Sequence, residues 1–347
     1  MRDRIAEQFA LSADDFGGML MRIGRDVAGA AVIVPAGEPP VDESSAAEPL
    51  SGEDLMKLVE ELPERPLGID ASGGIRLSLA GQQDKLVLVR TTAGWARPLF
   101  GYPSTTILKP EPGKFPGLVT NEFFALNLAA TVGLESARAR IERFGPHVLL
   151  SIDRFDRVHR DASPPERVHQ EDILTAAGFD PLYKYEYDDE YGQRGPSLRD
   201  MAELLVMHIG SAQLGRLLEI VVFNLVLGNA DAHARNLSLL LARDGSVALA
   251  PLYDVISTLA YPNVSKDLPQ RIANKRVFDD VTFEDLVEEA IGWGLAKEFV
   301  MGRARRILDS IKAGVDSVVR NTRDAGGDTE VLDQLRGIVL QRGDALS

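Results

Sequence analysis

Three polar residues in the second half of the chain have types and spacings that suit chemistry on phosphate groups. Asp231 and Asn236 follow an apolar stretch that ends at Gly228-Asn229, and Asp254 comes 18 residues after Asn236. Carboxylate and amide oxygens are hard ligands of the kind that Mg²⁺ prefers, and substrate phosphates commonly complete its shell. Asp231, five residues before Asn236, stands where a carboxylate could take the proton of an acceptor hydroxyl. The pattern predicts phosphoryl transfer, with Asp231 as the base and Asn236 and Asp254 as metal ligands.

A β-hairpin is expected to bring the two ends of this stretch together. Apolar runs flank Asp244-Gly245, which has the composition of a two-residue turn. If the residues on either side of this turn pair with each other, the ladder continues until Asn236 lies opposite Tyr253. Asp254, the next residue, is then expected beside Asn236.

The spacing has a precedent and also a purely structural alternative. Protein kinases separate their catalytic Asp from their metal-binding Asn by the same interval, and they place a second metal-binding Asp after a hairpin. The H-R-D and D-F-G words of those enzymes are missing here. The alternative is that Asp231 and Asn236 only cap a helix end and open a hairpin, as polar residues often do.

Candidate residues for the nucleotide lie earlier in the chain. The loop from Ala80 to Lys85 is small and polar, so its backbone amides could face phosphate oxygens, although an ordinary hairpin turn also explains it. Lys109 ends an apolar strand and could reach the phosphates, or it could be a surface lysine whose stem alone is buried. Asp153-Arg154-Phe155 follows another apolar strand, where backbone groups could pair with adenine. A salt-bridged strand end is the alternative for these three residues.

Composition limits the class of protein. The chain has 347 residues, 45% of them hydrophobic, which is enough for a sizeable core. It contains no cysteine, so disulfides, thiolate metal sites and cysteine nucleophiles are excluded. A formal net charge of -14 argues against general nucleic-acid binding, and the five histidines are scattered rather than arranged as a zinc site. The charged start and the lack of a long apolar run predict a cytoplasmic protein without a membrane anchor.

Secondary-structure patterns divide the chain into a strand-rich first part and a helix-rich second part. The stretch 36–48 is rich in Pro, Ala and acidic residues and is expected to be a solvated connector. Helical periodicity occurs at residues 197–210, 212–229, 282–294 and 297–322. We predict an α+β, bilobal, protein-kinase-like fold. Its N-lobe, residues 1–155, carries the sheet, the phosphate loop and the strand lysine, and its mostly α-helical C-lobe, residues 156–347, carries the catalytic loop and the metal-binding hairpin. A cleft between the lobes is the expected site.

Eight short sequence words occur in the order found in HipA-like kinases. They are SLAGQQDK, ILKP, TNEFFALNLA, SIDRFDR, HQEDI, KYE, GNADAHARN and LAPLYD. The family motifs look like S-[IV]-x-G-x-Q-x-K, a strand lysine, E-R-F-D-R, P-Q-E-D, K-Y-E, D-x-H-x-K-N and Y-D. The match runs from about Arg2 to the C-terminal helices. The chain thus resembles a bacterial serine/threonine protein kinase of the HipA-like toxin family.

The resemblance implies ATP-dependent phosphorylation of a protein hydroxyl with Mg²⁺ as cofactor, in a type II toxin-antitoxin system. The implied substrate class is a translation component such as an aminoacyl-tRNA synthetase. Asp231 is implied as the base, Asn236 and Asp254 as the Mg²⁺ ligands, and Ser78 as the serine whose autophosphorylation ejects the phosphate loop and silences the kinase. The implied nucleotide-binding residues are Ala80, Gly81, Gln82, Gln83, Asp84, Lys85, Lys109, Asp153, Arg154, Phe155, His233, Asn236, Tyr253 and Asp254.

The chain departs from the family pattern in a few places. Asp153 replaces the usual Glu, Arg235 replaces a common Lys, and His169 stands where Pro is frequent. The first residues, MRDRIAEQF, resemble a segment well inside full-length HipA-like kinases. The chain is therefore similar to the shorter HipT-like form, in which the N-terminal subdomain is a separate protein. A misassigned start or a truncated sequence is the alternative.

The resemblance also implies partners and leaves competing functions open. We expect a HipB-like helix-turn-helix antitoxin and a small HipS-like protein that supplies the N-terminal subdomain, with DNA reached only through the antitoxin. A small-molecule or lipid kinase is one alternative, because the same base and metal geometry serves any hydroxyl acceptor. A non-catalytic, ATP-binding component of an antitoxin complex is the other.

Overall fold

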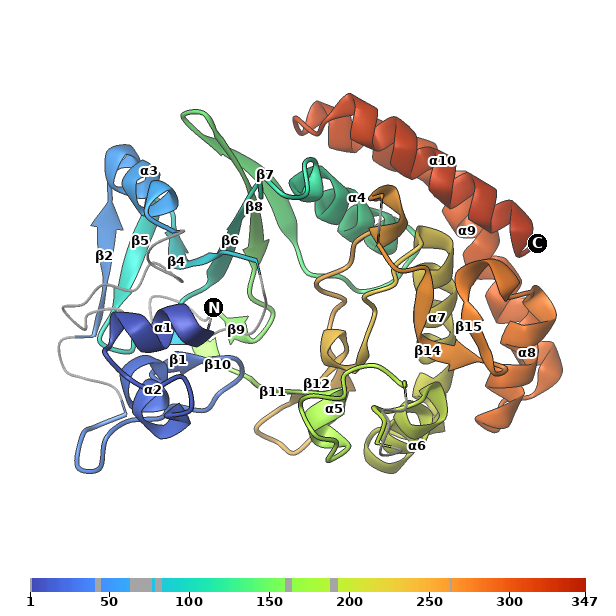
Figure 1. The fold of residues 1–347 in the computed structure, drawn as a ribbon, viewed down its shortest axis with the longest axis horizontal. Coiled ribbons are helices and arrows are strands. Elements are labelled where there is room, and N and C mark those ends of the chain that lie inside the picture. The colour runs from blue at the N-terminus through green and yellow to red at the C-terminus, as the bar shows by residue number, and fades with distance from the viewer. Residues whose placement is uncertain are drawn as a thin grey trace. The chain divides into compact units, whose positions relative to one another are not determined.

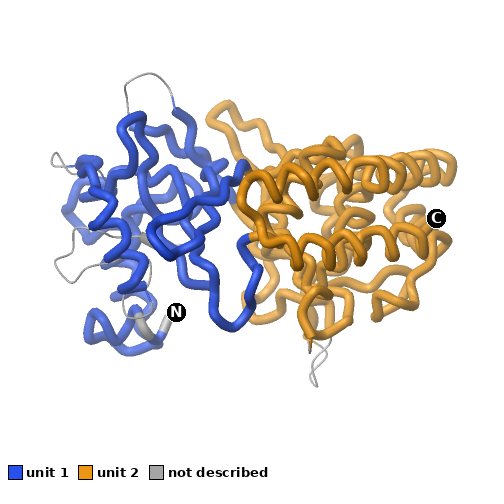
Figure 2. The backbone as a smooth tube through the Cα atoms, turned by 90° about the horizontal axis from the view of Figure 1, so that it is seen from above, with its two compact units in different colours: residues 1–119, 138–170 blue, residues 120–137, 171–347 orange. Residues whose placement is uncertain are grey.

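The chain forms two compact units in a computed structural model that describes residues 2–40, 45–62, 77–78, 83–159, 164–187, 193–262 and 264–347. The N-terminal unit comprises residues 1–119 and 138–170, and the C-terminal unit comprises residues 120–137 and 171–347 (Figure 2). This division differs from the predicted boundary after residue 155 in two ways. Residues 156–170 stay with the N-terminal unit because their arginines join its buried ion network. Residues 120–137 belong to the C-terminal unit, where Asn121 hydrogen-bonds the backbone of Ser257.

A six-stranded antiparallel sheet is the centre of the N-terminal unit (Figure 1). In spatial order its strands are β2 (Ala46–Leu50), β5 (Gly94–Leu99), β4 (Leu86–Thr91), β6 (Thr106–Pro110), β8 (His147–Asp153) and β7 (Ala139–Phe144). Strand β4 is apolar on both faces. Leu86 and Leu88 pack with the helix α3 (Gly52–Glu60), whereas Val87 packs with α1 (Arg2–Gln8) and α2 (Phe16–Ile23). This alternation follows from the two-residue period of a strand, and it buries β4 on both of its faces.

Edge strand β2 corrects one expectation from the sequence. Residues 36–48 were expected to form a solvated connector, but residues 46–48 pair with β5, and Pro49 continues the strand opposite Ala96. A proline is tolerated there because an edge strand has one side without a partner strand. The short, polar segment lacks the apolar alternation that identifies a strand in a sequence.

Two short pairs of strands complete the N-terminal unit. Strand β1 (Asp26–Val27) pairs in parallel with β3 (Leu77–Ser78), and β9 (Arg157–Val158) pairs antiparallel with β10 (Glu166–Arg167). The backbone of Ser78 thereby lies opposite Val27.

The C-terminal unit is mostly helical, as predicted. Its helices are α4 (Leu118–Thr131), α5 (Ile173–Ala176), α6 (Leu198–His208), α7 (Leu214–Leu227), α8 (Phe283–Gly292), α9 (Lys297–Asp324) and α10 (Thr329–Ala345), and its 3₁₀ helices are η1 (Ser211–Gln213), η2 (Ala234–Asn236), η3 (Thr258–Ala260) and η4 (Phe278–Asp280). Helix α7 is apolar around nearly its whole circumference because it packs against both α9 and α10 (Figure 1). Capping boxes at Ser197 and Thr282 fix the starts of α6 and α8. No helix in the described ranges is long and apolar enough to cross a membrane.

Two small sheets lie among these helices. One has the order β11 (His169–Asp172), β12 (Ser238–Leu241), β13 (Val247–Leu249), and the other pairs β14 (Asp267–Ile272) with β15 (Lys275–Val277). Strand β11 also carries the chain from the N-terminal unit into the C-terminal unit.

The hairpin β12–β13 forms, but its predicted register is wrong by one residue. Leu241 pairs with Val247, and the N–H of Ala242 donates to the carbonyl of Ser246 at 2.9 Å. The loop therefore has three residues, 243–245, and Gly245 adopts a left-handed φ of 83°. A glycine in this conformation suits a three-residue hairpin loop with a bulge, so Arg243 does not pair with Ser246.

Candidate active site

The segment that follows α7 is held by a series of local hydrogen bonds. Gly228 ends the helix with a left-handed φ of 73°, and a Cβ atom there would lie 2.8 Å from Leu259 Cδ1. Thr258 Oγ1 accepts a hydrogen bond from Ala230 N at 2.8 Å and donates one to Gly228 O at 3.1 Å. Asp231 N donates to the side chain of Asn229 at 3.1 Å. These contacts fix the loop at the point where Asp231 begins.

Asp231 is the centre of a polar cluster within the C-terminal unit. Its Oδ1 atom accepts a hydrogen bond from the hydroxyl of Tyr185 at 2.6 Å. The same oxygen lies 3.6 Å from Lys184 Nζ and 3.5 Å from His233 Nε2. The side chain of Asp231 is 44% exposed, so a substrate can reach it, although its neighbours are partly or fully buried. Helix capping alone therefore does not explain Asp231, because its carboxylate contacts side chains rather than helix amides.

Asn236 is oriented by the same loop. Its Nδ2 donates to the backbone carbonyl of Asp231 at 2.8 Å, and its backbone N–H donates to His233 O at 2.8 Å. The amide nitrogen is thus used internally, which directs the opposite end of the amide, Oδ1, away from that contact. A carbonyl oxygen presented in this way suits a hard cation.

The structure brings Asp254 to the same place by a route different from the predicted one. The ladder ends at Ser238, whose carbonyl accepts from Ala250 N at 2.8 Å, so Asn236 does not pair with Tyr253. One pocket in the C-terminal unit is nevertheless lined by His233, Asn236, Tyr253 and Asp254 together. Asp254 adopts φ 54°, a conformation that costs energy for a residue with a side chain.

Tyr253 supports this arrangement through the contacts of its hydroxyl. Its hydroxyl hydrogen-bonds Ser238 Oγ at 2.5 Å and the carbonyl of Arg235 at 2.7 Å. Burial raises the pKa of Tyr253 above its ordinary value, so the ring stays neutral. Its hydroxyl contacts show a structural part, in which it ties the chain before Asp254 to the loop before Asn236.

Two other groups have shifted pKa values with clear causes. Burial lowers the pKa of His233, and the nearby charge of Lys184 lowers it further, although Asp231 and Asp254 oppose the shift. Burial raises the pKa of Tyr185, and the hydrogen bond to Asp231 acts in the same direction. At neutral pH His233 is therefore uncharged, and Tyr185 keeps the proton that it donates to Asp231.

The predicted phosphate-side residues lie in the N-terminal unit. Lys109 and Lys85 are both only 5% exposed, and they adjoin the paired residues Leu86 and Leu108. Because neighbouring strand residues alternate in direction, both lysines point to the face opposite that leucine pair. Lys109 is thus not a surface lysine. Gln83 Nε2 donates to the carbonyl of Pro110 at 3.2 Å, next to Lys109. The remaining loop residues Ala80, Gly81 and Gln82, and the side chain of Ser78, lie outside the described residues.

The predicted adenine hinge has backbone donors that are already used. Asp153 N donates to Arg138 O, and Arg154 N donates to Thr105 O, both at 2.8 Å. The carboxylate of Asp153 forms an ion pair with Arg140 at 2.9 Å, which is the salt-bridged strand end that the sequence left as the alternative. The amides of Asp153 and Arg154 are therefore not available to adenine in this conformation.

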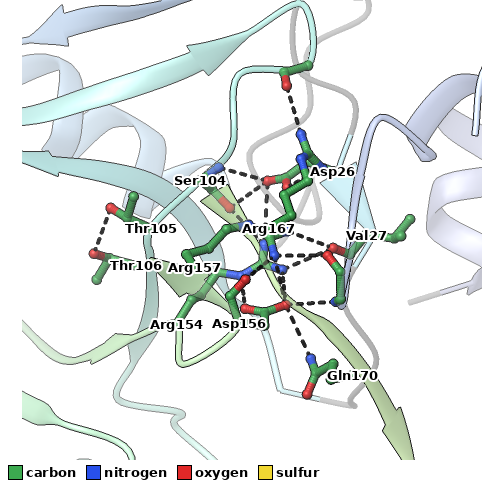
Figure 3. Close-up of polar contacts among 12 residues, drawn as sticks. Asp26, Val27, Ser104, Thr105, Thr106, Arg154, Asp156, Arg157, Arg167 and Gln170 are labelled. Atoms are coloured by element: carbon green, nitrogen blue, oxygen red, sulfur yellow. Dashed lines mark hydrogen bonds and ion pairs between the residues drawn. The ribbon is translucent and has the colours of Figure 1, made fainter. Parts of the chain in front are cut away.

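The side chain of Arg154 belongs to a buried ion network that the sequence did not reveal (Figure 3). Arg154 contacts Asp156 at 2.8 Å and Asp26 at 3.4 Å, while Arg157 contacts Asp26 and Arg167 lies 3.2 Å from the same carboxylate. Although burial opposes it, the charge and hydrogen bond of Arg154 hold the pKa of Asp156 below its ordinary value. The network fixes β1 against the segment that follows β8. Its only signal in the sequence is the word SIDRFDR.

Sequence reasoning also assigned no role to Lys184 and Tyr185, which lie 47 and 46 residues before Asp231. Their only signal was the word KYE. In the described part of the chain, no group of three or more His, Cys, Asp or Glu is arranged to hold a metal. Asn236 Oδ1 and the Asp254 carboxylate, two oxygen ligands at one pocket, still fit Mg²⁺, which takes few protein ligands when phosphates complete its shell.

Comparison with known proteins places the chain in a family. A model of the HipA-like C-terminal domain matches residues 77–319. Y4mE of Sinorhizobium fredii, a protein named as a kinase, is 36% identical over 326 residues, which cover 90% of this chain and 74% of that protein. The serine/threonine-protein kinase toxin HipA of Shewanella oneidensis is 28% identical over 327 residues, which cover 91% of this chain and 74% of that toxin.

A solved structure extends the match to three dimensions. It is the complex of Shewanella oneidensis HipA, HipB and operator DNA, and the alignment covers 99% of this chain and 82% of that one, with a TM-score of 0.83 and 26% identity. This likeness confirms the predicted α+β, bilobal, kinase-like fold. The chain belongs to the HipA-like family and is a kinase of the serine/threonine type.

Proposed function

We propose that the chain is an ATP- and Mg²⁺-dependent serine/threonine protein kinase that acts as the cytoplasmic toxin of a type II toxin-antitoxin system. The observation that carries the proposal is the cluster on Asp231, with Asn236 and Asp254 at one pocket beside it. The proposed target is a translation component such as an aminoacyl-tRNA synthetase. This part of the proposal comes from the family alone.

In the proposed reaction Asp231 receives the proton of an acceptor hydroxyl. The hydroxyl oxygen forms a bond to the γ-phosphorus of ATP, and the bond from that phosphorus to the β–γ bridging oxygen breaks, with its electron pair leaving on ADP. Mg²⁺ held by Asn236 and Asp254 would offset the negative charge of the phosphates. His233, neutral because it is buried, can donate or accept a hydrogen bond without adding charge.

The residues proposed to bind the phosphates of ATP belong to the N-terminal unit. We assign Lys109 to the α and β phosphates and residues 80–85 to the phosphate loop, because two buried lysines and Gln83 adjoin one strand pair. At the proposed hinge, residues 153–155, adenine would be contacted by groups other than the amides of Asp153 and Arg154, because those two amides already donate to carbonyls.

Substitution of the base tests the activity directly. We expect Asp231→Asn to lower transfer of label from [γ-³²P]ATP to protein by about 100-fold or more, because the amide cannot take a proton. Asp244→Asn is the matched control, since Asp244 lies in the exposed hairpin loop and contacts Ser246. Toxicity retained in Asp231→Asn would contradict the proposal and favour a non-catalytic component. Label found only in small molecules or lipids would favour the other alternative.

Autophosphorylation at Ser78 is the proposed means of silencing. Phosphate on Ser78 adds about two negative charges beside the nucleotide phosphates, so repulsion favours ejection of the loop. Mass spectrometry after incubation with Mg-ATP should locate the phosphate on Ser78, and Ser78→Ala should remain active for longer. Phosphate found at another residue, with Ser78 dispensable, would contradict this assignment.

We also propose a HipB-like antitoxin as partner, with DNA contacted through that antitoxin, and a small HipS-like protein at the N-terminal unit. The solved relative is a complex with HipB and operator DNA, which supports the first partner. Co-expression with the neighbouring reading frames, followed by affinity purification, tests both. Failure of any neighbouring product to co-purify would contradict the assignment.

A further inference from the structure

The segment 184–187 lies beside the catalytic loop and is held there by β14. The N–H of Glu186 donates to the carbonyl of Pro269 at 3.0 Å, and its carboxylate accepts from Arg271 N at 2.7 Å. The hydroxyl of Tyr187 donates to the carbonyl of Leu268. Glu186 is 9% exposed, so the anchor is buried. A buried anchor of this kind fixes where the preceding two residues can point.

Those two residues, Lys184 and Tyr185, point to the catalytic carboxylate. Tyr185 donates to Asp231 Oδ1 at 2.6 Å, and Lys184 Nζ lies 3.6 Å from the same oxygen. The Lys184 cation also lies 4.8 Å from the centre of the Tyr185 ring, and the ring of His233 packs edge-on against that ring at 5.4 Å. The two side chains therefore restrain each other as well as Asp231.

All three polar contacts of the Asp231 side chain converge on one oxygen. Tyr185 donates its hydrogen bond to Oδ1, the atom that also forms the ion-pair contacts with Lys184 and His233, and no hydrogen bond from the described residues ends on Oδ2. A carboxylate held by one oxygen presents its second oxygen in a fixed direction. Oδ2 is thus the atom that a substrate hydroxyl would meet.

We propose that Tyr185 is a positioning residue that aims Asp231 Oδ2 at the acceptor hydroxyl, and that Lys184 is a further catalytic residue that contacts the phosphoryl group being transferred. This inference rests on the proposed function. Lys184 is 32% exposed beside the base, and the hydroxyl that this base deprotonates must attack the γ-phosphate, so a cation there can offset the charge that develops on the phosphoryl oxygens. The proton passes from the acceptor oxygen to Oδ2, while Tyr185 keeps its own proton.

Tyr185→Phe tests the positioning role. The maximal rate of transfer from [γ-³²P]ATP to the chain itself should fall about tenfold, because a hydrogen bond to a charged group is lost. The Mg-ATP concentration that gives half the maximal rate should stay unchanged, since Tyr185 does not bind the nucleotide. Tyr102→Phe is the matched control, because it removes a tyrosine hydroxyl in the N-terminal unit, away from Asp231 and from the segment 184–187.

Lys184→Met and Lys184→Arg test the cation. We expect Lys184→Met to lose about tenfold or more in maximal rate and Lys184→Arg to recover most of it, because the arginine keeps the charge. Melting temperatures of all variants, measured by circular dichroism, should match that of the wild type, which separates a chemical loss from a folding defect.

The outcomes separate this inference from the proposed function. If Asp231→Asn is inactive while Tyr185→Phe and Lys184→Met keep the wild-type maximal rate, the inference is wrong and the proposed function stands. An equal loss in Tyr102→Phe would also overturn the positioning role, since removal of a tyrosine hydroxyl far from Asp231 would then have the same effect. Full activity of Asp231→Asn would remove the proposed function itself.

Discussion

His233 shows how a single residue is set by its surroundings. The imidazole lies within the pocket that Asn236 and Asp254 also line, and its Nε2 is 3.5 Å from the Asp231 carboxylate. An isolated carboxylate at that distance would favour the charged imidazolium. Burial outweighs this effect, because only 8% of the His233 side chain is exposed.

We predict that His233 titrates below its ordinary pKa in the nucleotide-free protein. The unfolded chain then binds more protons than the folded chain at mildly acidic pH, so His233 makes stability fall as pH drops below about 6.5. Two-dimensional NMR of the imidazole groups should give the pKa directly. An ordinary or raised value for His233 would show that Asp231 dominates instead.

The Asp254 backbone offers a second prediction at this scale. Asp254→Asn should fold normally, because Asn also tolerates the left-handed conformation at φ 54°. Mg²⁺ should nevertheless raise the nucleotide affinity of the variant less than it raises that of the wild type, since an amide lacks the negative charge of the carboxylate. Calorimetric titration with a non-hydrolysable ATP analogue, with and without Mg²⁺, measures this. Identical Mg²⁺ dependence in variant and wild type would contradict the assigned ligand.

At the scale of elements, buried ion pairs hold strand β1 in place, whereas apolar packing holds the helices. Strand β1 has only two residues and cannot hold itself on the unit by its ladder alone. Asp26 compensates, because its carboxylate accepts from the N–H and the hydroxyl of Ser104 at 3.0 and 2.6 Å and meets three arginines (Figure 3). Since β1 pairs with β3, the network also fixes the strand in which Ser78 lies.

Asp26→Asn should therefore be strongly destabilising. Removing one partner from a buried ion network leaves uncompensated charge, which costs about 3–5 kcal/mol. Urea unfolding followed by circular dichroism measures the loss. Asp316→Asn is the control, because it breaks an arginine pair of similar length, to Arg336, on the exposed surface between α9 and α10. An equal effect in the two variants would show that burial of the Asp26 network is unimportant.

At the scale of the whole molecule, the two units divide the candidate residues between them. Lys85, Lys109 and the proposed phosphate loop belong to the N-terminal unit by sequence range, and Asp231, Asn236 and Asp254 belong to the C-terminal unit. A nucleotide that binds residues from both units should stabilise both against unfolding. An Mg-ATP analogue at about 100 times its dissociation constant adds about 2.7 kcal/mol to the free energy of unfolding of the part of the chain that binds it.

Calorimetry should therefore show a rise in melting temperature for the whole chain with the Mg-ATP analogue. Lys109→Met, in the N-terminal unit, and Asp254→Asn, in the C-terminal unit, should each reduce that rise. Lys275→Met is the control, because Lys275 is an exposed residue of β15 outside the candidate site. A rise that is lost in only one of the two site variants would assign the nucleotide to a single unit.

The sequence by itself determined much of this protein through local physical rules. Apolar periodicity predicted the helices α6 to α9, because a helix must bury one or more of its faces. The order of strands and helices predicted the α+β fold class, and the spacing of the acidic and amide residues, together with the family words, predicted kinase activity. The interval between Asp231 and Asn236 also needs no tertiary information, since a loop of that length keeps both residues together.

The tertiary structure alone decided three other features. A one-residue change in loop length shifted the hairpin register, because Gly245 can adopt a conformation that other residues avoid. Arg154 joins a buried ion network because the fold brings Asp26, 128 residues earlier in the chain, to within 3.4 Å of it. Tyr185 meets Asp231 only because β14 holds its segment in place. Such contacts join residues that are distant in the chain, and local patterns carry no signal of which distant partner will be near.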